Sequence, residues 1–175
     1  MPGRLIYVMG PSGAGKNSVI ASAREKLNKN KYIHFSPRYL TRPTGQGDDA
    51  DLTLSAAAFA HYKRIGLFAL DWEAHGFCYG VGIAIDTLLH AGKCVVVNGS
   101  RDYAATALKK YPRMAAVLIT VKANVAHARL QARAREQPDA IERTARLRVK
   151  CGTTALRGRV SIKHRQQAWQ HLAPR

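Results

Sequence analysis

Long hydrophobic runs are missing from this 175-residue sequence. None reaches the roughly 18 to 20 apolar residues that a helix needs to cross a bilayer, so we expect no membrane-spanning segment. Cysteine is also scarce. The three cysteines are widely spaced and form no C-x-x-C pair, which favours reduced thiols in a cytoplasmic protein. A first strand expected within a few residues of the amino terminus leaves no room for a signal peptide.

Acidic residues are few: 11 Asp and Glu stand against 28 Lys and Arg, for a net charge of +17. No Asp or Glu follows Glu142, whereas nine Lys or Arg residues do. A charge of this size fits either nucleic acid or anionic small molecules. Aromatic residues that could stack on bases are sparse in the basic tail, where Trp169 stands alone. We therefore favour anionic small molecules as ligands and keep nucleic acid as the alternative.

Several catalytic patterns are absent as well. No His, Cys, Asp or Glu cluster has the spacing of a metal site, and no Ser-His-Asp or Cys-His arrangement can be read. The G-x-S-x-G pattern of one large hydrolase class does not occur. These absences argue against hydrolysis through an activated nucleophile and against a structural metal centre.

A glycine-rich segment lies between an apolar run at 5–9 and a helix-like run at 19–23. It matches the phosphate-binding loop G-x-x-x-x-G-K-[ST] in its required strand-to-helix context. Glycines let successive backbone N–H groups face one anion, and the following helix adds its positive end. The lysine reaches the β- and γ-phosphates. The sequence therefore predicts a nucleoside-triphosphate site made by Gly10, Pro11, Ser12, Gly13, Ala14, Gly15, Lys16, Asn17 and Ser18.

One position of this loop departs from the pattern. Asn17 stands where Ser or Thr usually holds Mg²⁺, and Ser18 follows it. If the site takes Mg²⁺, we expect Asn17 or Ser18 to lie near the metal.

The order of hydrophobic patterns predicts an α/β fold: a three-layer sandwich with a mainly parallel sheet. Strands are expected at 5–9, 32–35, 67–72, 77–81, 94–97 and 115–121. Helices are expected at 17–27, 55–64, 83–90, 103–111, 124–134, 140–150 and about 162–172. The segment 36–51 is rich in turn-forming residues and is expected to be irregular, within a small projecting subdomain.

Anion-binding side chains follow two of these strands, at the edge where parallel sheets bind ligands. Arg38 and Arg42 come after the strand that ends at 35, and arginine forks match phosphate oxygens. Asn98, Ser100 and Arg101 come after the strand that ends at 97. The alternative for each group is a solvated arginine or a plain turn.

Two arginines and a tyrosine complete the set of candidates. Arg133 and Arg135 lie beside a polar break between two helices, where an arginine could reach a transferred phosphoryl group. Tyr79 flanks the expected hairpin turn at 73–76 and is a candidate substrate contact, with packing as its alternative.

The combined motifs resemble one kinase family. They are the phosphate loop, Tyr39-Leu40-Thr41-Arg42, Leu70-Asp71-Trp72, Tyr79-Gly80-Val81-Gly82, Leu89-His90-Ala91-Gly92 and Val97-Asn98-Gly99-Ser100-Arg101. Over about residues 3–147 the chain resembles the ribose 1,5-bisphosphate phosphokinases of bacterial phosphonate breakdown, which are relatives of guanylate kinase. In that family a residue other than Ser or Thr usually follows the loop lysine, so Asn17 fits it.

The resemblance implies a fold, a reaction and roles for these residues. One P-loop domain like that of nucleoside monophosphate kinases would span 1–175, with a substrate-binding subdomain at about 36–82 and a lid at about 130–145. With ATP and Mg²⁺ it would phosphorylate ribose 1,5-bisphosphate to 5-phospho-α-D-ribose 1-diphosphate (PRPP). Lys16, Arg133 and Arg135 would be catalytic. Substrate would be bound by Arg38, Arg42, Tyr79, Asn98, Ser100 and Arg101.

Guanylate kinase is the nearest alternative. Its T-R-x-P-R pattern is incomplete here, because Pro43-Thr44-Gly45 follows Thr41-Arg42 and the second arginine is missing. Asn98 also replaces its strand-end aspartate, although Glu73 falls near the position of its guanine-reading glutamate. These differences favour the sugar bisphosphate as substrate. Whether two copies form a homodimer is left open by the sequence.

Overall fold

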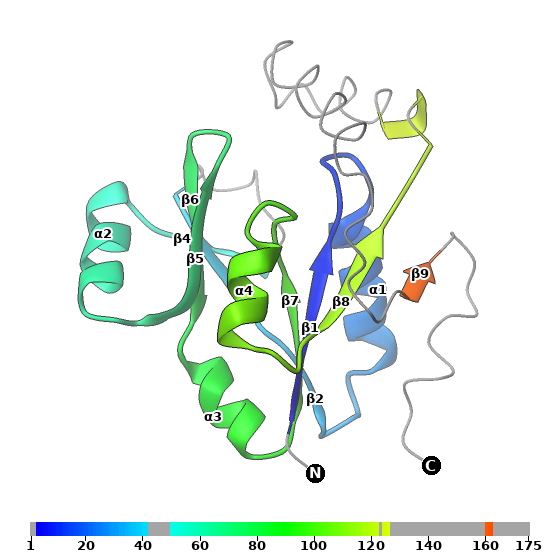
Figure 1. Ribbon diagram of the computed structural model, residues 1–175, viewed down its shortest axis with the longest axis horizontal. Coiled ribbons are helices and arrows are strands. Elements are labelled where there is room, and N and C mark those ends of the chain that lie inside the picture. Colours follow the sequence, from blue (N-terminus) through cyan, green and yellow to red (C-terminus); the bar gives the residue numbers. More distant parts are fainter. Residues whose placement is uncertain (1–2, 42–49, 123, 127–159, 163–175) are drawn as a thin grey trace.

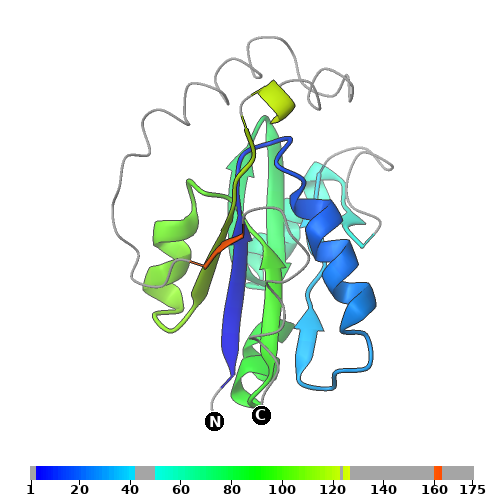
Figure 2. The same ribbon diagram turned by 90° about the vertical axis from the view of Figure 1, so that its right-hand side faces the viewer.

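The computed structural model describes residues 3–41, 50–122, 124–126 and 160–162 of the chain. Sheet A lies at its centre, with five strands in the order β2-β7-β1-β8-β9, each parallel to its neighbours. The strands are β1 (Arg4–Met9), β2 (Ile33–Phe35), β7 (Cys94–Asn98), β8 (Ala115–Ile119) and β9 (Val160–Ile162). Figure 2 shows helix α1 (Lys16–Lys26) on one side of this sheet and α4 (Ala104–Lys110) on the other. The predicted three-layer α/β sandwich is confirmed.

Alternating side chains of β1 fill two hydrophobic cores. Leu5, Tyr7 and Met9 pack in the core that also contains Ala104 and Ala107 of α4. That core also takes in α3 (Ala84–His90) through Ile85. Ile6 and Val8 lie in the second core, together with Ile20 of α1. A strand whose two faces are both covered is apolar throughout, which explains the continuous hydrophobic run in the sequence.

A second sheet, sheet B, has four strands in the order β4-β3-β6-β5. They are β3 (Arg38–Leu40), β4 (Leu52–Thr53), β5 (Phe68–Ala74) and β6 (Phe77–Gly82). Helix α2 (Ala56–Arg64) is capped at its N-terminus by Ser55, whose hydroxyl accepts from the Ala58 N–H at 3.1 Å. Figure 1 shows sheet B and α2 beside sheet A, on the side away from β9.

Two secondary-structure predictions need correction. The segment 36–51 was expected to be irregular, but β3 lies within it and pairs antiparallel with β6. A helix was expected from about residue 162, whereas Val160–Ile162 forms β9, which pairs with β8. Both strands have three residues, too few for a periodic signal, and depend on partners distant in sequence. The rest of that predicted helix, the helix at 140–150, most of the helix at 124–134 and the lid at 130–145 lie outside the described residues.

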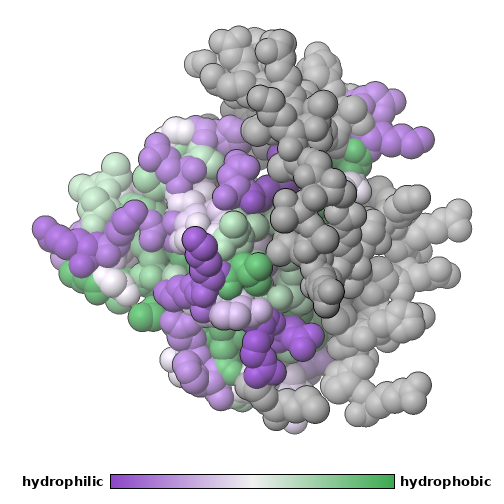
Figure 3. Space-filling view, in the orientation of Figure 1, coloured by the Kyte–Doolittle hydropathy of each residue, from purple (hydrophilic) through white to green (hydrophobic). Residues whose placement is uncertain are grey.

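Among the described residues, no helix combines the length and apolar character needed to cross a bilayer. Hydrophilic side chains alternate with smaller hydrophobic patches on the described part of the face in Figure 3. The exposed hydrophobic residues include Ile65, Leu67 and Ile83, which follow α2 or precede α3.

Candidate active site

Three sequence-predicted segments meet at one edge of sheet A. Strands β2, β7 and β1 are neighbours and run parallel, so their carboxyl ends lie at the same edge. The glycine-rich loop follows β1, the Arg38 segment follows β2, and Asn98 ends β7. In Figure 1 the loops after β1 and β7 leave the sheet at its upper end. Ligands of parallel sheets bind at this end.

The loop between β1 and α1 has the conformation that its glycines allow. Gly13 and Gly15 have φ angles of 75° and 84°, a region that side chains rarely adopt. At Gly10, an added Cβ would lie 2.4 Å from the carbonyl oxygen of Ile119, so only glycine permits this approach to β8. The Nζ of Lys16 donates to the carbonyls of Gly10 (2.8 Å) and Pro11 (3.1 Å). Its ammonium group therefore lies across the loop, where it can meet an anion.

Asn17 and Asn98 connect the loop to the end of β7. The side-chain Nδ2 of Asn98 donates to Oδ1 of Asn17 at 2.9 Å. Asn98 is 6% exposed, and its own Oδ1 has no hydrogen-bond partner among the described residues. An unpaired buried acceptor is costly unless a ligand or water donates to it or a metal binds it. The predicted donor and acceptor halves of the site are thus in direct contact.

Tyr7 holds the turn that follows Asn98. Its hydroxyl donates to the carbonyl of Ser100 at 2.9 Å and accepts from the Ser100 N–H at 3.0 Å. Burial raises the pKa of Tyr7 well above its ordinary value of 10.0, so the phenol stays protonated and keeps its donor. Gly99 lies directly against the ring, where an added Cβ would come within 2.0 Å of Tyr7 Cζ.

Arg101 lies in the turn between β7 and α4. The Asp102 N–H donates to Oγ of Ser100 at 3.3 Å, and the Ala104 N–H donates to the carbonyl of Arg101 at 3.2 Å. Arg101 is partly exposed. Within the described part of the chain, no hydrogen bond or ion pair engages its guanidinium group. The turn is therefore ordered, while the guanidinium can still meet an anion.

The predicted site residues of sheet B are engaged with other side chains. Nε and Nη2 of Arg38 donate to the two carboxylate oxygens of Asp51 at 3.0 and 2.6 Å, and both side chains are largely buried. The guanidinium also lies 5.8 Å from the ring centre of Tyr79. This bidentate pair fixes the guanidinium within sheet B, so any anion would have to share it with Asp51.

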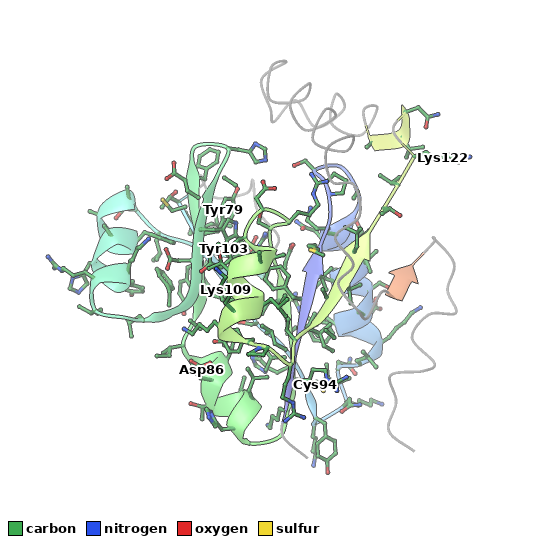
Figure 4. The ribbon with its side chains drawn as sticks, in the orientation of Figure 1. Tyr79, Asp86, Cys94, Tyr103, Lys109 and Lys122 are labelled. Carbon is green, nitrogen blue, oxygen red and sulfur yellow. The ribbon has the colours of Figure 1, made fainter. Side chains whose placement is uncertain are left out.

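Tyr79 is buried and belongs to an aromatic stack. Trp72 stacks on Tyr79 and on Tyr103, with 5.6 Å between ring centres in each pair. Figure 4 shows Tyr79 on β6 and Tyr103 just before α4, where sheet B meets that helix. The stack joins sheet B to the turn that carries Arg101.

Three predicted site residues, Arg42, Arg133 and Arg135, lie outside the described residues. Within the described part of the chain, no three His, Cys, Asp or Glu side chains gather as a metal site would require. Sequence reasoning missed Tyr7 and Asp51. A signal for Tyr7 existed, since a hydroxyl within an otherwise apolar buried strand needs a partner. Asp51 had no local signal, because its partner is 13 residues away.

Comparison with known proteins identifies the family. The chain is 47% identical over 139 residues to the ribose 1,5-bisphosphate phosphokinase PhnN of Desulfomicrobium baculatum, covering 79% of this chain and 74% of that protein. It is 46% identical over 138 residues to the protein of the same name from Burkholderia mallei, with the same coverage. The chain belongs to the ribose 1,5-bisphosphate phosphokinase family. No family model matches it.

Solved structures agree with the fold of this phosphokinase family member. Guanylate kinase from Anaplasma phagocytophilum is similar with a TM-score of 0.59 and 18% identity, over 87% of this chain and 89% of that one. A sugar kinase from Janibacter is similar with a TM-score of 0.51 and 17% identity, over 97% and 90%. At these identities the likeness concerns the fold, which is that of P-loop kinases, as predicted.

Proposed function

We propose that the protein transfers the γ-phosphoryl group of ATP to the 1-phosphate of ribose 1,5-bisphosphate and so forms 5-phospho-α-D-ribose 1-diphosphate. Membership of the phosphokinase family supports the reaction. The observation on this chain that supports it is the Asn98–Asn17 hydrogen bond, which joins the end of β7 to the glycine-rich loop. In-line transfer needs the two phosphates next to each other. The protein itself forms no covalent bond and contributes mainly positioning and charge.

The donor half is the loop from Gly10 to Ser18. Its amides and the N-terminus of α1 would hold the ATP phosphates, and Lys16 would leave its two loop carbonyls for the β- and γ-oxygens. The oxygen atoms of Asn17, Ser18 and Asn98 fit Mg²⁺, which prefers hard oxygen ligands. The unpaired buried Oδ1 of Asn98 is the observation behind this assignment. When bound, Mg²⁺ neutralises developing phosphate charge.

The acceptor half is the turn after β7, with residues 36–82 as the proposed substrate-binding subdomain. Arg101 and Ser100 would hold one phosphate of the sugar, and Arg42 the other. Asn98, whose Nδ2 donates to Asn17, would act on the acceptor through the Mg²⁺ that its Oδ1 would help to hold. Arg38 would contribute positive charge at this site while its guanidinium group, the fork, stays paired with Asp51. Tyr79 would act by packing under that fork.

The chemistry requires no general base. An acceptor phosphate is mostly ionised at neutral pH, since its second pKa is about 6. The work is to hold two repelling anions in line and to stabilise charge as it moves. Lys16 would do this from the loop, and Arg133 and Arg135 from the proposed lid at 130–145. A cytoplasmic location, where ATP is supplied, goes with this proposal.

A phosphoryl-transfer assay with ATP and Mg²⁺ tests the proposal, with ribose 1,5-bisphosphate and GMP compared as acceptors at matched concentrations. We expect kcat/KM to favour the sugar bisphosphate by at least about 100-fold, because Asn98 and the missing second arginine remove contacts expected for GMP. Preference for GMP would replace the proposal with a guanylate kinase. If the protein phosphorylates neither acceptor but binds nucleic acid at physiological salt, the nucleic-acid alternative is favoured.

A further inference from the structure

Tyr7 contacts the acceptor turn, residues 99–103 between β7 and α4, through two different parts of its side chain. The hydroxyl binds both backbone groups of Ser100, as donor to the carbonyl and as acceptor from the N–H. The ring lies against Gly99 so closely that no side chain fits there. Tyr7 itself is fully buried in the middle of β1. The acceptor turn is therefore fixed in place by a side chain that is itself locked in the core.

The hydroxyl is not needed to fill the core. A phenylalanine would pack the same ring among the same neighbours. Among the described residues, Ser100 is the hydroxyl's only hydrogen-bond partner. Burying a hydroxyl is costly without partners, so its presence here is explained by what it does for Ser100.

We propose that Tyr7 is a positioning residue of the acceptor site: it fixes the backbone of Ser100 and thereby aims Ser100 and Arg101 at the acceptor phosphate. This inference rests on the proposed function. Because Tyr7 is fully buried, it would act on the substrate through the turn. The donor loop does not depend on it, because Lys16 and the loop glycines make their contacts elsewhere.

Tyr7→Phe is the test, since it keeps the ring and removes both hydrogen bonds. Tyr111→Phe is the matched control. The Tyr111 hydroxyl likewise donates a hydrogen bond, to Asp86 at 2.6 Å, but Tyr111 is only partly buried and lies after the far end of α4. We expect Tyr7→Phe to raise the KM for the acceptor roughly tenfold, equivalent to about 1.4 kcal/mol, with the KM for ATP unchanged. Tyr111→Phe should leave both KM values unchanged.

Hydrogen exchange at the Ser100 amide, measured without substrate, tests the Tyr7–Ser100 hydrogen bonds independently of the reaction. We expect loss of protection in Tyr7→Phe and none in Tyr111→Phe. Unchanged protection, or equal rises in the KM for ATP and for acceptor, would overturn the inference. Wild-type turnover decides the proposed function separately: if GMP proves to be the acceptor, the same comparison of KM values is made with GMP.

Discussion

Gly99→Ala is the sharpest perturbation of the acceptor turn. The new Cβ would lie 2.0 Å from Cζ of Tyr7, whereas ordinary contact begins at 3.4 Å. Ring and turn must therefore separate by roughly 1.4 Å, the difference between these distances. Tyr7 cannot give way, because it is fully buried in a central strand. The displacement falls on the turn that carries Ser100 and Arg101.

Two effects of different size should follow. Misplacing a binding group by about 1 Å can cost on the order of 100-fold in rate, so we expect kcat/KM for ribose 1,5-bisphosphate to fall about that much. Overpacking of this kind also lowers the free energy of unfolding by about 1 to 3 kcal/mol. Steady-state kinetics and urea denaturation measure the two effects separately.

Gly66→Ala controls for lost stability. Gly66 has a φ of 72° and open space around its Cβ position, so alanine there causes backbone strain of about 1 to 2 kcal/mol without a clash. We expect lower stability and unchanged kcat/KM, since Gly66 follows α2. Equal kinetic losses in both variants, or wild-type kinetics in Gly99→Ala, would refute the reasoning.

Three further predictions concern other groups. Lys16→Ala should lower kcat about 100- to 1,000-fold, the scale for one lost transition-state donor, and near-wild-type turnover would contradict the loop assignment. Asp51→Ala should lower the free energy of unfolding by on the order of 3 kcal/mol in urea denaturation, because it leaves the Arg38 side chain, which is 12% exposed, without its carboxylate. Asp71→Ala breaks the exposed pair with Lys63 and should cost at most about 1 kcal/mol. Burial raises the pKa of Tyr111 above 10.0, so the unfolded chain releases this proton first and stability falls as pH rises above 10. Tyr111→Phe should make that decline less steep above about pH 10, measured by denaturation at each pH; an equally steep decline would contradict it.

The fold was predictable because its signals are local. The apolar runs of β1 and β7 are continuous since both of their faces are covered. The conformation of the glycine-rich loop is likewise determined by its own residues, because Gly13 and Gly15 adopt positive φ angles. The strands that were missed, β3, β4 and β9, have only two or three residues each and form through partners distant in sequence. Their stability comes from pairing, which no local pattern records.

The site was predictable in its parts but not in its connections. Lys16 could be named from the glycine-rich loop pattern, and Asn98 and Arg101 because they lie at or just after the end of a strand. The hydrogen bonds that organise them span 81 residues between Asn98 and Asn17 and 93 residues between Ser100 and Tyr7. Such contacts depend on strand order, with β1 between β7 and β8. A sequence pattern gives the residue types but not which of them meet.

These two long-range contacts have a common consequence for phosphoryl transfer. Asn98 is bonded to the donor loop and Ser100 to β1, the strand from which that loop emerges. Residues 98 and 100 are thus fixed to one rigid unit that also carries Lys16. Sheet B packs into the same core as β1 and β7 through Ala69, Leu70 and Val81. Trp72 of β5 also stacks on Tyr103, beside the turn after β7. Under the proposed function, these contacts would set the distance between donor and acceptor phosphates, and the Arg38–Asp51 pair, which lies within sheet B, would act on the acceptor side only. Substitutions at Asn17 should accordingly affect both substrates, and substitutions at Asp51 the acceptor alone.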